Sequence, residues 1–188
     1  YSVWASNVIY NETMKKYVMY FCTTSSYVKS TLCFATADNI EGPYTYVDTI
    51  LYSGYGKSNI SETNLYDVLG KNADISRYLE YGGYNNKEWP NCIDPAIFTD
   101  ADGRMWMNYG SWSGGIFLLE IDPTTGYPIY PVDDKDADPY YGYRLIGGGH
   151  HSAEGPYIQY DAENGYYYLF VSYGDLQSDG EYQIRQFR

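Results

Sequence analysis

Two acidic residues hold similar places in two similar stretches of the chain. When the stretches are aligned on Ile97 and Ile158, Asp94 and Glu154 both stand just before a predicted strand. Two carboxyl groups that share a pocket cannot both ionise freely, so one keeps its proton to higher pH and becomes a candidate general acid. Each residue alone fits an ordinary turn element equally well. The similar placement favours function, and such a pair suits the cleavage of glycosides.

An internal repeat supplies the elements that position this pair. Three stretches follow one plan: an apolar strand, a polar hairpin turn, a second aromatic-rich strand and a third strand. The predicted strands cover residues 7–10, 17–21 and 31–36 in the first stretch, 95–98, 105–109 and 115–119 in the second, and 156–159, 166–172 and 182–185 in the third.

Glycines support two of the predicted hairpin turns. Gly103 and Gly165 fall where a short hairpin needs a positive φ, a conformation that glycine adopts without strain. Asp100-Ala101-Asp102-Gly103 also resembles the start of a calcium loop. It lacks the later ligands and the closing Glu, so we interpret it as a hairpin turn.

Antiparallel units that repeat along a chain predict an all-β fold in which each unit is one blade of a β-propeller. Residues 51–91 and 127–149 show weak periodicity and are predicted to be long connections, which usually build functional sites. Rotation about one axis brings the starts of the innermost strands to one end of the channel, so we expect Asp94 and Glu154 to face a common pocket. In the first stretch Ala5 and Ser6 hold that place.

The composition limits the partners that the protein can have. The 26 Tyr, 19 Gly and 8 Pro favour strands and turns, and the aromatic side chains predict a Tyr-rich core, sugar-stacking surfaces or both. The 24 Asp and Glu outnumber the 12 Lys and Arg, and the net charge of −12 repels nucleic acids and anionic membranes. No apolar run approaches the roughly 20 residues that span a bilayer. We expect no nucleic-acid or membrane partner.

The cysteines predict neither a disulfide framework nor a zinc site. Cys22, Cys33 and Cys92 are an odd number, without Cys-x-x-Cys spacing and without a His pair at zinc spacing. Cys22 and Cys33 lie in neighbouring predicted strands, yet buried free thiols are the favoured interpretation. We expect no metal site and no cofactor in this chain.

Motifs over essentially the whole chain resemble the endo-1,5-α-L-arabinanases of glycoside hydrolase family 43. Their fixed order makes the resemblance much more specific than any single motif. In chain order, the motifs are Trp4-Ala5, Val8-Ile9-Tyr10-Asn11, Ala37-Asp38-Asn39-Ile40-Glu41-Gly42-Pro43-Tyr44, Asn91-Cys92-Ile93-Asp94-Pro95, Tyr109-Gly110-Ser111-Trp112, Gly114-Gly115-Ile116-Phe117, Asp138-Pro139-Tyr140-Tyr141-Gly142 and Ala153-Glu154-Gly155-Pro156-Tyr157-Ile158.

The resemblance implies a five-bladed β-propeller that hydrolyses α-1,5-linked arabinan with inversion, of which this chain covers roughly three blades. It implies that Glu154 is the general acid and that Asp94 orients this acid and raises its pKa. The family's catalytic base is an Asp before the first strand of the first blade, and no such motif precedes Trp4. We therefore expect residues 1–188 to lack the first blade and the C-terminal blades, and to be inactive alone.

The same resemblance places substrate-binding residues around the pair. Asn91, Ser111 and the backbone of Cys92 and Ile93 are expected to supply hydrogen bonds to arabinose.

Two tryptophans are expected to supply apolar faces to the sugar. Trp112 and Trp4 take this role, although a position in the blade core is an equal alternative for Trp112. Relatives often carry an aromatic residue where this chain has Ser113, so one sugar-stacking wall differs. Relatives also continue Trp-Ala with Pro-Asp, where Ser6 and Asn7 stand here.

Two alternative functions stay open. An exo-acting α-L-arabinofuranosidase or β-xylosidase of the same family shares the blades and the acid and differs mainly in its loops. A non-catalytic glycan-binding propeller that has lost its base belongs to a different class. The resemblance further implies plant cell-wall arabinan or arabino-oligosaccharides as the partner, secretion, and a central calcium ion in the complete protein. We expect a monomer.

Overall fold

Antiparallel sheets make up nearly all the regular structure of the computed structural model, which describes residues 1–177 and 180–188. The first sheet is a meander of four strands in the order β1-β2-β3-β4. These strands are β1 (Ser2–Asn11), β2 (Lys16–Ser26), β3 (Lys29–Ala37) and β4 (Thr45–Tyr52). Three of them match the predicted strands of the first repeat. The fourth was missed, because its pairing with β3 is interrupted by two register shifts and only its last residues are buried.

The second sheet contains two strands that were not predicted from the sequence. Its path is β10-β9-β8-β7, and β11 also pairs with β9. The predicted strands correspond to β7 (Ala96–Thr99), β8 (Met105–Tyr109) and β9 (Ile116–Ile121). The stretch 127–149, expected to be only a connection, supplies β10 (Pro128–Ile129) and β11 (Tyr143–Ile146). Both strands are short, so no alternating pattern marks them in the sequence.

The third sheet has the order β12-β13-β14, as the third repeat predicts. Its strands are β12 (Ala153–Asp161), β13 (Tyr166–Gly174) and β14 (Tyr182–Phe187). The two predicted turn glycines, Gly103 and Gly165, have φ values of 83° and 72°, which confirms the hairpin interpretation.

The innermost strands of the three sheets lie beside one another in chain order. The strand β7 packs against β1 on one side and against β12 on the other. Two hydrogen bonds join the sheets: Asn7 Oδ1 accepts the N–H of Ile97 at 3.1 Å, and Asn108 Nδ2 donates to the carbonyl of Pro156 at 2.7 Å. This arrangement confirms that the repeats are successive propeller blades, with β1, β7 and β12 nearest the axis.

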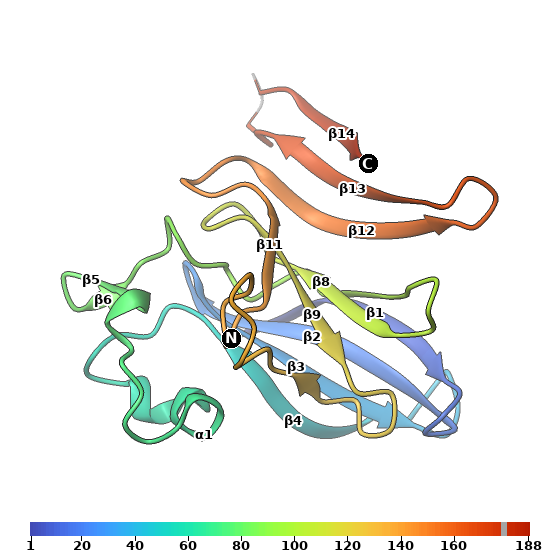
Figure 1. The fold of residues 1–188 in the computed structure, drawn as a ribbon, viewed down its shortest axis with the longest axis horizontal. Helices are drawn as coiled ribbons and strands as arrows, with labels where there is room; N and C mark the ends of the chain where they lie inside the picture. The colour runs from blue at the N-terminus through green and yellow to red at the C-terminus, as the bar shows by residue number, and fades with distance from the viewer. Residues whose placement is uncertain (178–179) are drawn as a thin grey trace.

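A long connection between β4 and β7 covers one flank of the first two blades. Figure 1 shows it as a series of short elements at one side of the molecule. In chain order they are the 3-10 turn η1 (Ile60–Glu62), the helix α1 (Leu65–Leu69), the 3-10 turn η2 (Ser76–Tyr78), and the hairpin β5 (Leu79–Glu80) and β6 (Gly83–Tyr84). The prediction of a long connection at 51–91 is therefore correct, apart from the last residues of β4.

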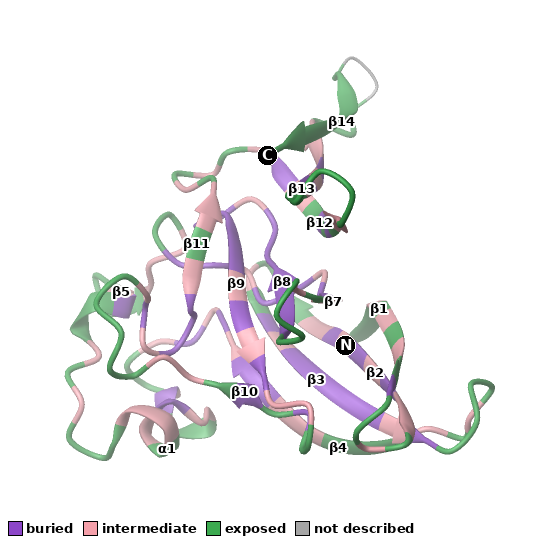
Figure 2. Cartoon of the chain, turned by 45° about the vertical axis from the view of Figure 1, so that its right-hand side comes forward, coloured by how far each residue is buried: buried purple, intermediate pink, exposed green. Residues whose placement is uncertain are grey.

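Buried tyrosines form much of the core, which runs through the first two blades and the long connection (Figure 2). The five fully buried tyrosines are Tyr20, Tyr78, Tyr109, Tyr140 and Tyr141. Each of their hydroxyl groups donates a hydrogen bond, as buried phenols require. The hydroxyl groups of these core tyrosines are therefore satisfied by groups within the protein.

The three cysteines are buried free thiols, as predicted. Burial raises the pKa of the Cys22 thiol to about 11 and that of Cys92 further, so both stay protonated at neutral pH. Within residues 1–177 and 180–188, no helix has the length and hydrophobicity that a membrane crossing requires.

Candidate active site

A β-bulge interrupts the innermost strand of the first and third blades near its start. The pairing of β1 with β2 shifts after Trp4, and the pairing of β12 with β13 shifts after Glu154. The next residue has a positive φ in both strands, 47° at Ala5 and 57° at Gly155. Bulges re-aim the neighbouring side chains and are frequent beside active sites.

The second blade places Asp94 at the corresponding point before β7, with a φ of 55°. Asp94 is therefore equivalent to Gly155 and Ala5, whereas Glu154 lies one residue earlier, inside β12. The expectation that the two acids hold equivalent positions before their strands is wrong by one residue. The sequence alignment missed this offset because only the backbone conformation, not the apolar pattern, locates the bulge.

The two carboxyl groups nevertheless come together. Asp94 Oδ2 accepts a hydrogen bond at 3.2 Å from the N–H of Gly155, the residue directly after Glu154. Glu154 Oε2 accepts from Ser111 Oγ at 3.0 Å, and Glu154 Oε1 accepts from Tyr182 Oη at 2.6 Å. Donors from the second and third blades thus hold both oxygens of Glu154 beside Asp94.

Asp94 is the carboxyl group whose pKa the site clearly perturbs. Burial raises its pKa to about 6, the hydrogen bond from Gly155 lowers it, and the negative charge of Glu154 raises it again. The sequence analysis expected an ionised Asp94 that shifts its neighbour. The two acids are coupled electrostatically, since the charge of Glu154 contributes to the raised pKa of Asp94. Below about pH 6 Asp94 therefore carries a proton.

Tyr182 is a site residue that the sequence analysis missed. Glu154 pairs with Ser172 of β13, and Ser172 pairs with Ile184 of β14, so these three side chains share one face of the sheet. Tyr182 stands two residues before Ile184 and uses the same face, opposite Gly174, which has no side chain. The phenol therefore reaches diagonally across the sheet to the acid. Only the strand register distinguishes it from the other tyrosines.

The residues before Asp94 are tied into the fold. Cys92 is fully buried and its N–H donates to Ser53 Oγ at 3.0 Å, while the N–H of Ile93 donates to the carbonyl of Asn91 at 2.9 Å. Both N–H groups are therefore used internally, and the expectation that the backbone of Cys92 and Ile93 binds arabinose stays a prediction for their carbonyl groups. The half-buried Asn91 side chain stays a predicted sugar contact, and its Oδ1 lies 3.5 Å from Ser53 Oγ.

The loop between β8 and β9 carries three of the expected substrate-binding residues. Ser111 is buried and donates to Glu154, so it orients the acid. Trp112 is half-buried, with a φ of 46°, and its N–H donates to the carbonyl of Ala153 at 2.8 Å. Ser113 is buried, and its hydroxyl has no hydrogen-bond partner among the described residues. The loop therefore joins the second blade to the strand that carries Glu154.

Trp4 lies at the start of the first blade, at the position equivalent to Glu154. Its side chain is 45% exposed, and its Nε1 donates to Thr24 Oγ1 at 3.1 Å. The indole is thus oriented by one hydrogen bond while part of its surface stays open. Its role as an apolar face for a sugar stays a prediction.

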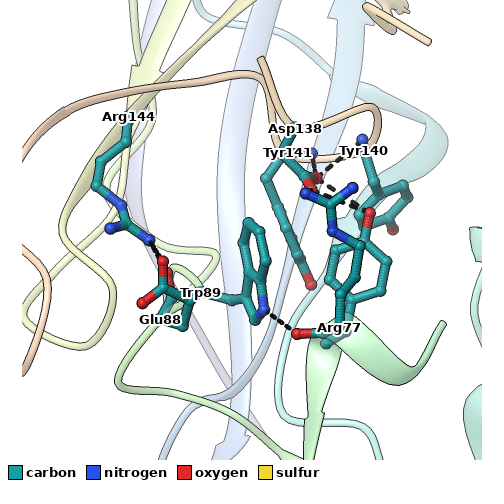
Figure 3. A network of polar contacts seen from close by, with 8 residues as sticks. Arg77, Glu88, Trp89, Asp138, Tyr140, Tyr141 and Arg144 are labelled. Carbon is teal, nitrogen blue, oxygen red and sulfur yellow. Dashed lines mark hydrogen bonds and ion pairs between the residues drawn. The ribbon is translucent and has the colours of Figure 1, made fainter. Parts of the chain in front are cut away.

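A polar network behind the site fixes the long connection to the second blade (Figure 3). The buried carboxylate of Asp138 accepts the N–H groups of Tyr140 and Tyr141 at 3.0 and 2.8 Å and the hydroxyl of Tyr78 at 3.1 Å, and lies 3.4 Å from Arg77. Burial raises the pKa of Asp138 although these partners oppose the shift. The motif that begins at Asp138 therefore serves to lock two segments together.

The same network supports the loop that carries Ser111. The guanidinium of Arg144 donates to the backbone carbonyl and the carboxylate of Glu88, and the carbonyl of Trp89 accepts the N–H of Gly114. A Cβ atom at Gly114 would lie 2.4 Å from the carbonyl oxygen of Glu88, so only glycine permits this close approach. The Glu88–Trp89 segment therefore fixes the position of the loop that carries Ser111 beside Glu154.

Neither a metal site nor the calcium-like motif is part of this site. Among residues 1–177 and 180–188, no group of three His, Cys, Asp or Glu side chains is arranged to hold a metal ion. Asp100 instead accepts bonds from the N–H groups of Asp102 and Arg104 and from the indole of Trp106, which confirms the hairpin turn. The calcium ion implied by the resemblance stays a prediction for the complete protein.

Successive propeller blades with a carboxyl pair at the start of their innermost strands define a β-propeller of the glycoside hydrolase type. The chain belongs to glycosyl hydrolases family 43, whose family model matches residues 62–188. An extracellular endo-α-(1→5)-L-arabinanase of Thermotoga petrophila is 39% identical over 97% of the chain, and a second such protein of Bacillus subtilis is 38% identical over 98%.

Solved structures agree with this assignment. The endo-1,5-α-L-arabinanase of Thermotoga petrophila matches 98% of the chain with a TM-score of 0.75 and 40% identity. A family 43 glycoside hydrolase of Bacillus licheniformis matches the same share with a TM-score of 0.77 and 38% identity. The chain spans about a third of its relatives, 34% of the two curated sequences and 36% of both solved chains.

Proposed function

We propose that this chain is part of a secreted hydrolase that cleaves α-1,5-linked L-arabinan with inversion of configuration. The observation that carries the proposal is the adjacent pair Asp94 and Glu154, with both oxygens of Glu154 held by hydroxyl donors. The names of the two curated relatives support arabinan as the substrate, endo cleavage and an extracellular location.

In this mechanism Glu154 donates its proton to the glycosidic oxygen while the bond from that oxygen to the anomeric carbon breaks. Water attacks the anomeric carbon from the opposite face, and a base removes the proton of that water. Asp94 lies beside Glu154, and we propose that it orients this acid and that its charge opposes a second negative charge there.

The base belongs outside residues 1–188 in this proposal. In inverting glycosidases the acid and base are about 6.5–9.5 Å apart, on opposite faces of the scissile bond. The first blade offers Trp4 and Ala5 where the later blades offer acids. We therefore propose that a preceding blade supplies the base and that following blades complete the ring and hold any calcium ion. The complete propeller would act as a monomer.

Exo cleavage is the second candidate. A protein of Cellvibrio japonicus named as an extracellular exo-α-(1→5)-L-arabinofuranosidase is 33% identical over 45% of the chain. Exo and endo enzymes of one family share the acid and differ in the loops that close the sugar-binding groove. The long loops of this chain therefore matter for the choice between the two actions.

Product analysis of the complete protein on linear arabinan tests the proposal. Endo action releases a ladder of oligosaccharides early in the reaction, whereas exo action releases one short product from the start. Glu154→Gln should lower hydrolysis of arabinan by about 10²–10⁴-fold with little change in binding, because only the proton donor is lost. Aryl arabinofuranosides with good leaving groups should lose much less. An equal loss on both substrates would exclude Glu154 as the acid, and an inactive wild type would exclude arabinan hydrolysis.

A further inference from the structure

Tyr182 makes the shortest polar contact at the candidate site. Its hydroxyl lies 2.6 Å from Glu154 Oε1, while Ser111 Oγ lies 3.0 Å from Oε2. The two donors approach from different blades, Tyr182 on β14 and Ser111 after β8. Together they fix the plane of the carboxyl group, since each oxygen is bound by its own hydroxyl.

The polar contacts of the Tyr182 hydroxyl lie on the face of the sheet that carries Glu154. Its hydroxyl donates to Glu154 Oε1 and lies beside the hydroxyl of Ser172. Burial and the hydrogen bond to Glu154 raise the pKa of the phenol, so the hydroxyl is protonated at the pH at which arabinan would be cleaved. It therefore remains a donor to Glu154.

A hydroxyl suits both protonation states of an acid. It donates to the charged carboxylate, and it accepts from the protonated carboxyl after a rotation about its C–O bond. A side chain with only donors would have to lose its contact each time Glu154 takes up a proton. The phenol keeps the carboxyl in one orientation throughout the reaction cycle.

Resting on the function proposed above, we propose that Tyr182 is a positioning residue for the general acid Glu154. It carries no proton to the substrate and makes no bond to it. Its hydroxyl and that of Ser111 hold the Glu154 carboxyl so that one oxygen points to the leaving group. A misplacement of about 1 Å at a reacting group costs roughly 10²-fold in rate, so a hydroxyl that prevents such movement contributes to kcat.

The test compares Tyr182→Phe with Tyr157→Phe in the complete protein. Tyr157 lies on strand β12 of the same sheet, and its hydroxyl makes no side-chain hydrogen bond among the described residues, so it is a matched control. Tyr182→Phe should lower kcat on linear arabinan by about tenfold or more while KM changes little, because binding is left intact. Tyr157→Phe should match the wild type.

The pH profile separates positioning from a general structural effect. The Tyr182 hydroxyl favours the charged form of its partner, which is the inactive form of an acid. Its removal should therefore move the alkaline limb of the kcat profile to higher pH, and Ser111→Ala should move it in the same direction. A Tyr182→Phe protein with wild-type kcat and an unmoved alkaline limb would overturn the inference.

Failure of this inference is distinguishable from failure of the proposed function. If the wild-type protein releases no product from arabinan, the function is wrong. If the wild type is active and Tyr182→Phe loses kcat equally on arabinan and on an activated aryl arabinofuranoside, Tyr182 acts on something other than proton donation and the inference is overturned. Thermal unfolding of both variants shows whether either has lost its fold.

Discussion

The first and third blades share a β-bulge near the start of the innermost strand, but they carry different side chains at this bulge. The innermost strands β1 and β12 both bulge near their starts, after Trp4 and after Glu154, and both continue with a residue of positive φ. Their hairpins also match, since the pairs Asn11–Lys16 and Asp161–Tyr166 each close a four-residue turn. The backbone of the two strands is thus alike from the bulge to the turn, while only one of them carries an acid.

The two blades repeat one backbone conformation, whereas the side chains at the bulge differ between them. A bulge at the start of an inner strand directs a side chain toward the end of the propeller axis, whichever residue stands there. In the third blade that residue is Glu154, held by two hydroxyl donors. In the first blade it is Trp4, whose indole bonds to Thr24. The site is therefore a property of particular residues on a repeated frame, and single substitutions can change it without altering the frame.

The largest expected effect concerns the catalytic base, which we propose lies outside residues 1–188. We predict that residues 1–188 expressed alone release no reducing ends from linear arabinan, because no carboxylate of the first blade stands where the later blades have theirs. Restoring a preceding blade with its base and the following blades should restore turnover. General acid or base catalysis typically contributes about 10²–10⁴-fold, and loosened blade edges reduce the rate further.

Two controls make this result interpretable. Circular dichroism must show that the short chain is folded, since open blade edges lower stability. The completed protein with Glu154→Gln must also be inactive on arabinan. Robust turnover by the short chain would mean that its own residues supply the base, and the difference between the blades would lose its functional meaning.

A second, smaller effect separates the function of Asp94 from its contribution to stability. Asp94→Asn keeps an oxygen that accepts from Gly155 and removes a half-buried charge. Activity should fall by about 10²-fold, since the charge that acts on Glu154 is lost. The free energy of unfolding at pH 7 should rise by about 2 kcal/mol, because a partly exposed carboxyl whose pKa is about 6 no longer has to ionise in the folded protein.

The pH dependence of the free energy of unfolding follows from the raised pKa of Asp94. The folded pKa of Asp94, about 6, exceeds the ordinary value of 3.8, so the folded protein binds more protons than the unfolded chain between these values. The contribution of Asp94 to stability therefore decreases as the pH rises from about 4 to about 6 and is constant above. Urea unfolding of the wild type and of Asp94→Asn over this range should show curves that separate with rising pH. Parallel curves would mean that Asp94 ionises as easily in the fold as in water.

Much of this architecture could be predicted from the sequence, because each blade alternates apolar strands with polar turns. The nine strands of the three repeats are all present, and Asp94 and Glu154 do meet. The misses have a common physical cause. The one-residue offset of Glu154 and its partner Tyr182 depend on register and bulges. These are set by tertiary pairing, which the apolar pattern of one strand does not encode.

The smallest effect tests whether the matched hairpins are equivalent in energy as well as in shape. Lys15 has a φ of 56° at the position where the third blade has Gly165, with a φ of 72°. A non-glycine residue in the left-handed region costs about 1–2 kcal/mol, while glycine loses about 0.5–1 kcal/mol more backbone entropy on folding. The pair of Lys15 with Glu12 at 3.1 Å is exposed and adds little. Lys15→Gly should therefore stabilise the protein slightly, by about 0.5 kcal/mol.

The reverse change at the third blade completes the test. A Cβ atom at Gly165 would meet no atom within 4 Å, so Gly165→Ala adds only the strain of its positive φ. It should destabilise the protein by about 1 kcal/mol, measured as a lower urea midpoint with an unchanged slope. Opposite signs for the two substitutions would show that one turn geometry governs both hairpins. Equal signs would mean that Lys15 makes contacts that offset its strain, and that the likeness of the two blades ends at the bulge.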